Sequence, residues 1–89
     1  MTHRYTIEFR RSAEKQLGKL EGQIRARILR TIVTLADDPR PPGVKALTGE
    51  IGLWRIRIGD YRVVYEINDT GLLILVVRIA HRSDVYRRR

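Results

Sequence analysis

The sequence of 89 residues contains no cysteine and only two histidines, His3 and His81. Without cysteine the chain has neither a disulfide framework nor a thiolate metal site. The spacing of the histidines suggests no two-histidine arrangement, and the acidic residues form no cluster with the spacing of metal ligands. We therefore expect no metal and no small-molecule cofactor.

Long apolar runs are also missing. No stretch approaches the ~20 residues that a membrane-spanning helix needs. The first residues include no apolar core of the secretory kind, so the expected location is the cytoplasm, with no membrane partner. The chain is long enough to bury a modest core, and its 43% of hydrophobic residues argues against disorder. We expect one domain over residues 1–89.

Negative charge is scarce, because 10 acidic residues face 18 basic ones and the formal charge is +8. Fifteen of the basic residues are arginine, and the three lysines are Lys15, Lys19 and Lys45. Arginine suits planar, bidentate contact with phosphate or carboxylate, although a GC-rich genome also enriches it. The charge favours nucleic acid or an acidic protein as partner. The alternative is a solvated basic surface that has no partner.

The strongest structural signal is a hairpin whose two strands meet at a Gly59-Asp60 turn. Side chains alternate across a strand, so Trp54 and the isoleucines after it face the core, whereas Arg55 and Arg57 face the other way. A two-residue loop places Arg57 directly opposite Arg62, and like charges in that arrangement destabilise a sheet. A bound anion would relieve the repulsion, and a phosphate backbone is the simplest anion of the right shape.

The N-terminal half is predicted to form one strand and two helices. The strand covers about residues 4–9, and Ser12 can cap the helix that follows. A longer helix is predicted over about residues 21–36, with Arg27 and Arg30 facing solvent. Its apolar stripe follows the helical period and consists of Ile24, Ile28, Ile32 and Leu35. A tight connection should pack the two helices as an antiparallel hairpin.

The C-terminal half is predicted to form three strands. A linking segment over residues 44–53 leads into the hairpin, and a second turn lies at residues 68–71. Residues 72–79 are almost all apolar, the pattern of a strand buried on both faces. The order is therefore β-α-α-β-β-β, which predicts an α+β fold. A helical hairpin should pack on one face of a curved, mainly antiparallel sheet and leave the arginines on the other.

Three stretches of this sequence carry a family resemblance. They are Lys45-Ala46-Leu47-Thr48-Gly49, Gly59-Asp60-Tyr61-Arg62-Val63-Val64-Tyr65 and His81-Arg82-Ser83-Asp84-Val85-Tyr86. Together with the element order, they make essentially the whole chain resemble the RelE toxin family. The resemblance implies a toxin of a type II toxin–antitoxin system that cuts mRNA in the ribosomal A site, as a metal-independent endoribonuclease. It also implies a cognate antitoxin, the ribosome and mRNA as partners.

The resemblance also implies a set of site residues. The expected catalytic residues are Arg55, Arg57, Arg62, Arg82 and Tyr86, and further RNA contacts are expected at Lys45, Arg78, His81 and Arg87. The best-studied type of member carries lysine where this chain has Arg55 and Arg57, and arginine cannot act as a general base. We expect the arginines to orient the RNA backbone and stabilise the charge of the transition state. Tyr86 is expected to handle a proton, with His81 as the alternative acid or base.

Other interpretations of these residues stay open. The arginines could be solvated strand positions, and Tyr86 could cover the sheet edge. The related ParE group shares the fold and poisons DNA gyrase, which makes gyrase inhibition the alternative function. A third possibility is an inactive member that only binds its antitoxin. The complete cationic cluster ending in Tyr86 favours the endonuclease, because ParE-like chains generally lack it.

Overall fold

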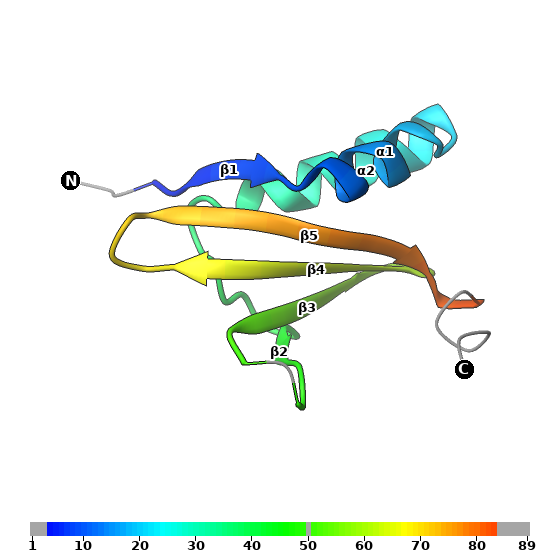
Figure 1. Cartoon of the computed structure of the whole chain (residues 1–89). Coiled ribbons are helices and arrows are strands. Elements are labelled where there is room, and N and C mark those ends of the chain that lie inside the picture. The colour runs from blue at the N-terminus through cyan, green and yellow to red at the C-terminus, as the bar shows by residue number, and fades with distance from the viewer. Residues whose placement is uncertain (1–3, 50, 84–89) are drawn as a thin grey trace.

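The structure, a computed structural model, describes residues 4–49 and 51–83 and places two helices on one side of a sheet (Figure 1). Its elements in chain order are β1 (Thr6–Phe9), α1 (Arg11–Gly18), α2 (Gly22–Thr34), β2 (Lys45–Ala46), β3 (Leu53–Ile58), β4 (Tyr61–Asn68) and β5 (Leu73–His81). The predicted α+β class and the helical pair on a mainly antiparallel sheet are confirmed. No helix within the two described ranges is long and apolar enough to span a membrane.

The sheet has five strands in the order β1-β5-β4-β3-β2. The first strand pairs in parallel with the last, and the other neighbours are antiparallel. The prediction of a plain link over residues 44–53 is wrong at Lys45 and Ala46, which pair with Arg55 and Trp54. This two-residue strand extends the sheet beyond the hairpin and brings a lysine beside an arginine.

The hairpin of β3 and β4 has the predicted register. Ile58 pairs with Tyr61, and Arg57 pairs with Arg62. Gly59 has a φ of 61°, a conformation that most residues with a side chain avoid. The Gly59-Asp60 turn therefore holds the two arginines directly opposite each other.

A bulge in β5 changes which side chains face the helices. Val64 pairs with Arg78 but the next residue, Tyr65, pairs with Val76, so Val77 is the extra residue. Val76 and Ile79 are consequently both part of the buried core although three positions separate them. Arg78 falls on the open face of the sheet. The expectation that this strand is buried on both faces holds only for its middle, since Leu73 and Leu75 are partly exposed.

The core lies between the helices and the sheet. Its fully buried side chains of largest volume are Tyr65, Ile28, Ile32, Leu35, Ile74, Val63 and Val76. The predicted stripe of the second helix is thereby confirmed, with Ile24 half-buried at its end. The hydroxyl of Tyr65 donates a 2.7 Å hydrogen bond to the carbonyl of Pro39, and this bond ties the segment after α2 to the central strand.

The helix ends differ from the predicted ones by a few residues. Arg10 is the N-cap of α1 and makes no side-chain capping bond, so the prediction of Ser12 as the cap is wrong. Glu21 caps α2, because its carboxylate accepts a 3.3 Å hydrogen bond from the backbone N–H of Ile24. That helix ends at Thr34, before the predicted position 36, in a tightened last turn.

A polar cluster fastens the end of the sheet that lies away from the Gly59-Asp60 turn. Asp69 accepts a 2.7 Å hydrogen bond from the hydroxyl of Tyr5 and bidentate bonds of 3.0 and 3.3 Å from Arg40. The bonds from Arg40 and then Tyr5 hold the pKa of Asp69 below its ordinary value. The Arg40 guanidinium also lies 4.9 Å from the ring centre of Trp54, which is half-buried against the core.

Candidate functional site

Five basic residues share the face of the sheet that the helices leave open. Register places Lys45 beside Arg55, Arg55 beside Val64 and Val64 beside Arg78 in one row across four strands. The neighbouring row is Arg57, Arg62 and Ala80. Paired residues of antiparallel strands point to the same side. We call Lys45, Arg55, Arg57, Arg62 and Arg78 the cationic face.

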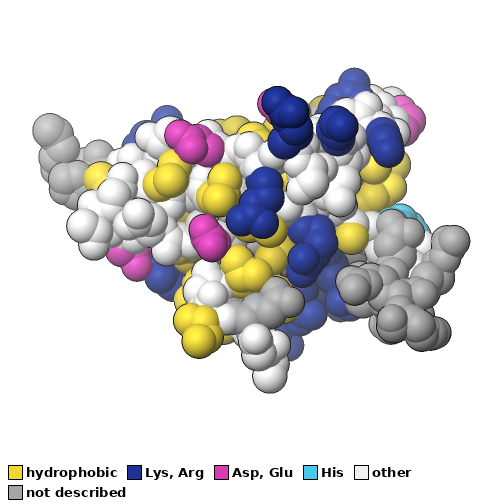
Figure 2. Space-filling model, viewed as in Figure 1, with side chains coloured by type: hydrophobic (Ala, Val, Ile, Leu, Met, Phe, Trp, Pro, Cys, Tyr) yellow, Lys and Arg dark blue, Asp and Glu magenta, His cyan; other side chains and the backbone are white. Residues whose placement is uncertain are grey.

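The cationic face lies toward one end of the sheet. The turn after β3 and the last residues of β5 meet there, since Tyr61 pairs with His81 (Figure 1). Lys and Arg side chains gather on this half of the molecule (Figure 2). In the described part of the chain, no carboxylate forms an ion pair with Arg55, Arg57 or Arg62. The positive charge of these three arginines is therefore not compensated by any carboxylate in the described ranges.

Arg62 is the innermost arginine of this group. It sits on the central strand and is only partly exposed, and Val64 on the same face is 5% exposed. The Nε atom of Arg62 is buried and has no hydrogen-bond partner among the described residues. Leaving a buried donor unsatisfied costs about 1–3 kcal/mol. An anionic oxygen that reached this guanidinium would supply the missing acceptor and offset the repulsion from Arg57.

Arg82 lies at the hairpin turn, beside the cationic face rather than on it. Its backbone N–H donates a 2.7 Å hydrogen bond to the carbonyl of Asp60, and its Nη1 lies 3.8 Å from the Asp60 carboxylate. Both side chains are more than half exposed, so the ion pair is weak and easily exchanged for another anion. Arg82 is thereby held at the end of the sheet where the arginines are concentrated.

His81 is held by its neighbours. Its ring meets Tyr61 edge-on, with centroids 5.0 Å apart. Its Nδ1 accepts a 3.1 Å hydrogen bond from the backbone N–H of Ser83 and lies 2.8 Å from the Ser83 hydroxyl. An accepting Nδ1 places the proton of the neutral ring on Nε2. The other two predicted residues of the C-terminal segment, Tyr86 and Arg87, lie outside the described residues.

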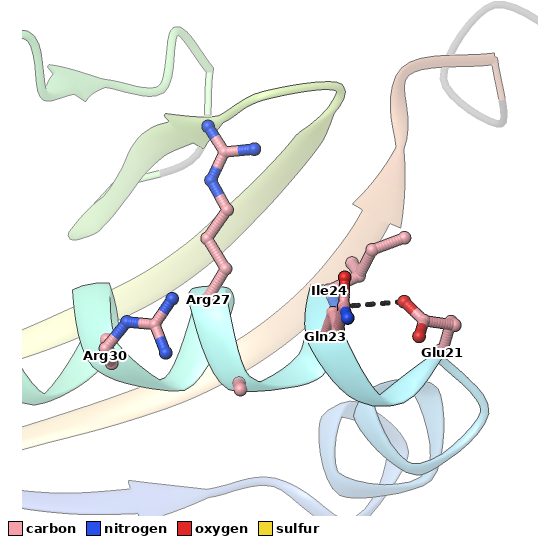
Figure 3. A pocket seen from close by; sticks show the side chains of 6 residues that line it. Glu21, Gln23, Ile24, Arg27 and Arg30 are labelled. Atoms are coloured by element: carbon pink, nitrogen blue, oxygen red, sulfur yellow. Dashed lines mark hydrogen bonds between the residues drawn. The ribbon is translucent and has the colours of Figure 1, made fainter.

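Arg27 is exposed, as predicted, but the sequence reasoning missed its closeness to the hairpin turn. Its guanidinium extends from α2 toward the hairpin turn (Figure 3), and Nη1 lies 3.1 Å from the position that a Cβ on Gly59 would occupy. Helical periodicity assigns Arg27 to the polar side of α2 but does not show that this side borders the turn. Arg27 therefore extends the basic surface to the hairpin turn, and Arg30 is exposed as predicted.

The arrangement is suited to holding and stabilising negative charge on phosphate. Arginines offer paired N–H donors to phosphate oxygens and keep their charge throughout a reaction. Within residues 4–49 and 51–83, no group of three histidine, aspartate or glutamate side chains could hold a metal ion. Four of the five groups on the cationic face are arginines, so the face supplies mainly fixed positive charge.

Known proteins resemble this chain in both sequence and structure. The family model described as ParE toxin of type II toxin-antitoxin system, parDE, matches residues 7–86. Toxin RelG from Mycobacterium tuberculosis is 35% identical over 86 residues, covering 94% of this chain and 98% of the relative. The toxin–antitoxin complex RelBE2 from the same organism contains a chain that is 31% identical, with a TM-score of 0.79 and coverage of 89% and 99%. A RelE–RelB complex from Pyrococcus horikoshii gives 30% identity and 0.78, with coverage of 92% and 97%.

Proposed function

Because this chain belongs to the RelE toxin family and is a toxin of a type II toxin–antitoxin system, we propose that it is an endoribonuclease that depends on the ribosome. It cuts mRNA in the ribosomal A site and thereby inhibits translation. The observation that carries this proposal is the cationic face, where Arg57 lies opposite Arg62 and neither forms an ion pair with a carboxylate among residues 4–49 and 51–83. We propose that residues 1–89 act as one toxin domain in the cytoplasm.

The proposed reaction uses the RNA's own 2′-hydroxyl as nucleophile. The 2′-oxygen bonds to the neighbouring phosphorus, the bond to the 5′-oxygen breaks, and the products carry a 2′,3′-cyclic phosphate and a 5′-hydroxyl. Arg55, Arg57 and Arg62 bind the phosphate and stabilise the extra negative charge of the phosphorane, and Arg82 adds a contact at the turn. Lys45, Arg78 and Arg87 hold the adjoining backbone.

Protons move through groups beside the cationic face. The 2′-hydroxyl must lose a proton and the departing 5′-oxygen must gain one. We propose Tyr86 as the residue that handles a proton, and His81 as the alternative. In the neutral ring of His81 Nε2–H can hydrogen-bond to the leaving oxygen, whereas transfer of a proton to that oxygen requires the imidazolium form. Because few acid–base groups are available, the rate of cleavage depends strongly on how the RNA is positioned, and the ribosome supplies that positioning.

The proposed protein partner is a cognate antitoxin. Solved relatives from Mycobacterium tuberculosis and Pyrococcus horikoshii are toxin–antitoxin complexes. An antitoxin that covers the cationic face or shifts Arg82 from the turn would keep RNA away from the arginines. Binding to the helices would serve equally well if it altered the sheet end.

The test is to map mRNA 5′ ends in a reconstituted translation reaction, with and without ribosomes. Wild-type protein should cut within codons at the A site and leave naked RNA intact. Arg62→Ala and Tyr86→Phe should lose cleavage and growth inhibition while they keep the far-UV circular dichroism of the fold. Arg30→Ala is the matched control, because it removes one exposed charge from α2 without touching the cationic face. Full toxicity of both site variants would refute the assignment.

Gyrase inhibition is the second candidate function. The matching family model is described as a ParE toxin, and ParE-like proteins share this fold. Intact mRNA under continued translation, together with inhibited DNA supercoiling by purified gyrase, would favour this candidate. A-site cuts with unaffected supercoiling would exclude it.

A further inference from the structure

A cavity of about 410 Å³ lies between the end of α1 and the last residues of β5. Its walls include Gln16 and Lys19 from α1, Tyr61 from the start of β4, and Arg78 and His81 from β5. We call this cavity the edge pocket. Its volume falls within the ~300–1,000 Å³ of pockets that hold small ligands.

The edge pocket exists because β1 is short. Its last pairing with β5 is Phe9 with Val76, so no strand covers the edge of β5 beyond that point. Gln16 replaces one hydrogen bond that a neighbouring strand would make, because its Oε1 accepts a 2.8 Å hydrogen bond from the backbone N–H of Ile79. This bond fixes the amide, and its Nε2 donor has no acceptor in the described part of the chain.

The lining of the edge pocket suits a flat, uncharged ring with polar edges. Tyr61 and His81 are half-buried and meet edge-on at 5.0 Å, so an aromatic surface is available for stacking. The fixed amide of Gln16 offers a directed donor to a base edge. Lys19 and Arg78 supply positive charge for the phosphates that flank a base.

The edge pocket and the cationic face share part of β5. Arg78 lines the pocket and also belongs to the row of Lys45 and Arg55. Ala80, a further wall residue, pairs with Arg62. A chain of RNA whose phosphate lies against Arg62 therefore has its next nucleotide within reach of the pocket.

We propose that the edge pocket binds the base of a nucleotide next to the scissile phosphate and sets the base preference of the cut. This inference rests on the proposed nuclease function, and it adds Gln16 and Lys19 of α1 as specificity-determining residues. Gln16 reads the base edge through Nε2. Lys19 holds the flanking phosphate at the mouth.

The first measurement is cleavage of mRNAs with a randomised A-site codon, read by sequencing the cut ends. Gln16→Glu keeps the oxygen that accepts from Ile79 but replaces the donor, so the base preference at one position should change about fivefold or more. Lys19→Ala should weaken that preference. Matched controls are Gln23→Glu on α2 and Lys15→Ala on α1, both exposed and outside the pocket lining; they should leave the preference as in wild type.

The second measurement is independent of cleavage. Each of the four nucleoside 5′-monophosphates is titrated into the protein, and the backbone amide signals of Ile79, Ala80 and His81 are followed by NMR. Shifts that depend on the base in wild type and are reduced in Gln16→Glu would support base binding in the edge pocket. They would do so even if the protein cut no mRNA. The absence of cleavage alone would refute the nuclease proposal and not the binding of bases.

Three outcomes would overturn the inference. The first is cleavage with no base preference in wild type. The second is a preference that Gln16→Glu and Lys19→Ala leave unchanged. The third is the absence of nucleotide-induced shifts together with weaker antitoxin binding by these variants, which would assign the pocket to a protein side chain.

Discussion

Arg57→Gln should make the protein more stable and less toxic at the same time. Arg57 is exposed on β3, lies directly opposite Arg62 and forms no ion pair within the described residues. Like charges opposed in an antiparallel pair destabilise it by roughly 0.2–1 kcal/mol. For a domain of this size, removing that repulsion corresponds to a rise of about 1–8 °C in Tm. Glutamine keeps a polar stem on the strand and removes only the charge.

The assay is thermal unfolding followed by circular dichroism at low and high salt. At about 1 M salt the screening length falls to ~3 Å, so the gain should largely disappear. Inorganic phosphate at low salt should stabilise wild type more than Arg57→Gln, because binding to the folded state raises its stability. Arg30→Gln is the control: it changes charge equally but lies on α2, and its effect should stay within about 0.5 kcal/mol. A lower Tm for Arg57→Gln than for Arg30→Gln at low salt would refute the reasoning.

The remaining predictions concern the scaffold and the chemistry. Tyr65→Phe should lose about 0.5–1.5 kcal/mol in urea denaturation, because the Pro39 carbonyl loses its donor; an unchanged midpoint would contradict this. Burial raises the pKa of Tyr65 to about 12 from 10.0. The neutral Tyr65 hydroxyl therefore contributes fully to the free energy of unfolding below pH 10, and this contribution is lost as the pH rises toward 12. Alkaline titration should therefore destabilise wild type more steeply than Tyr65→Phe. Hydrogen bonds from Arg40 and Tyr5 hold the pKa of Asp69 low, so this stabilisation exists above the ordinary aspartate pKa and is lost as pH falls. Asp69→Asn should make the free energy of unfolding less dependent on pH in the acid range, and it should change the fluorescence of Trp54. The same pH dependence in variant and wild type would argue against a stabilising role of the Tyr5, Arg40 and Asp69 cluster. Cleavage should persist in a chelator, and loss of cleavage that Mg²⁺ restores would overturn the metal-free mechanism.

The hairpin was predictable because two local rules determine it. Alternation along β3 assigns Arg55 and Arg57 to one face, and a two-residue turn leaves only one register in which Arg57 meets Arg62. The second helix was predictable in the same way, from the spacing of its buried isoleucines. Both inferences depend on residues close together in the chain.

The parts that escaped prediction depend on distant residues or on very short elements. Two residues, Lys45 and Ala46, are too few to show a period, so their pairing with β3 left no signal. The bulge at Val77 lies in an apolar run that has no alternation to interrupt, so the side on which Arg78 lies could not be assigned. The bond from Ile79 to Gln16 joins residues 63 positions apart. No local pattern encodes such a contact.

The pairing of β1 with β5 has a consequence for the order of events during synthesis. The N-terminal strand has no partner until residues 73–76 have been made, and such non-local pairings form slowly. Arg78 belongs to the same late strand, so sheet closure and assembly of the cationic face coincide. Each newly made copy therefore passes most of its own translation without a complete cationic face, and the fold itself delays the assembly of that surface.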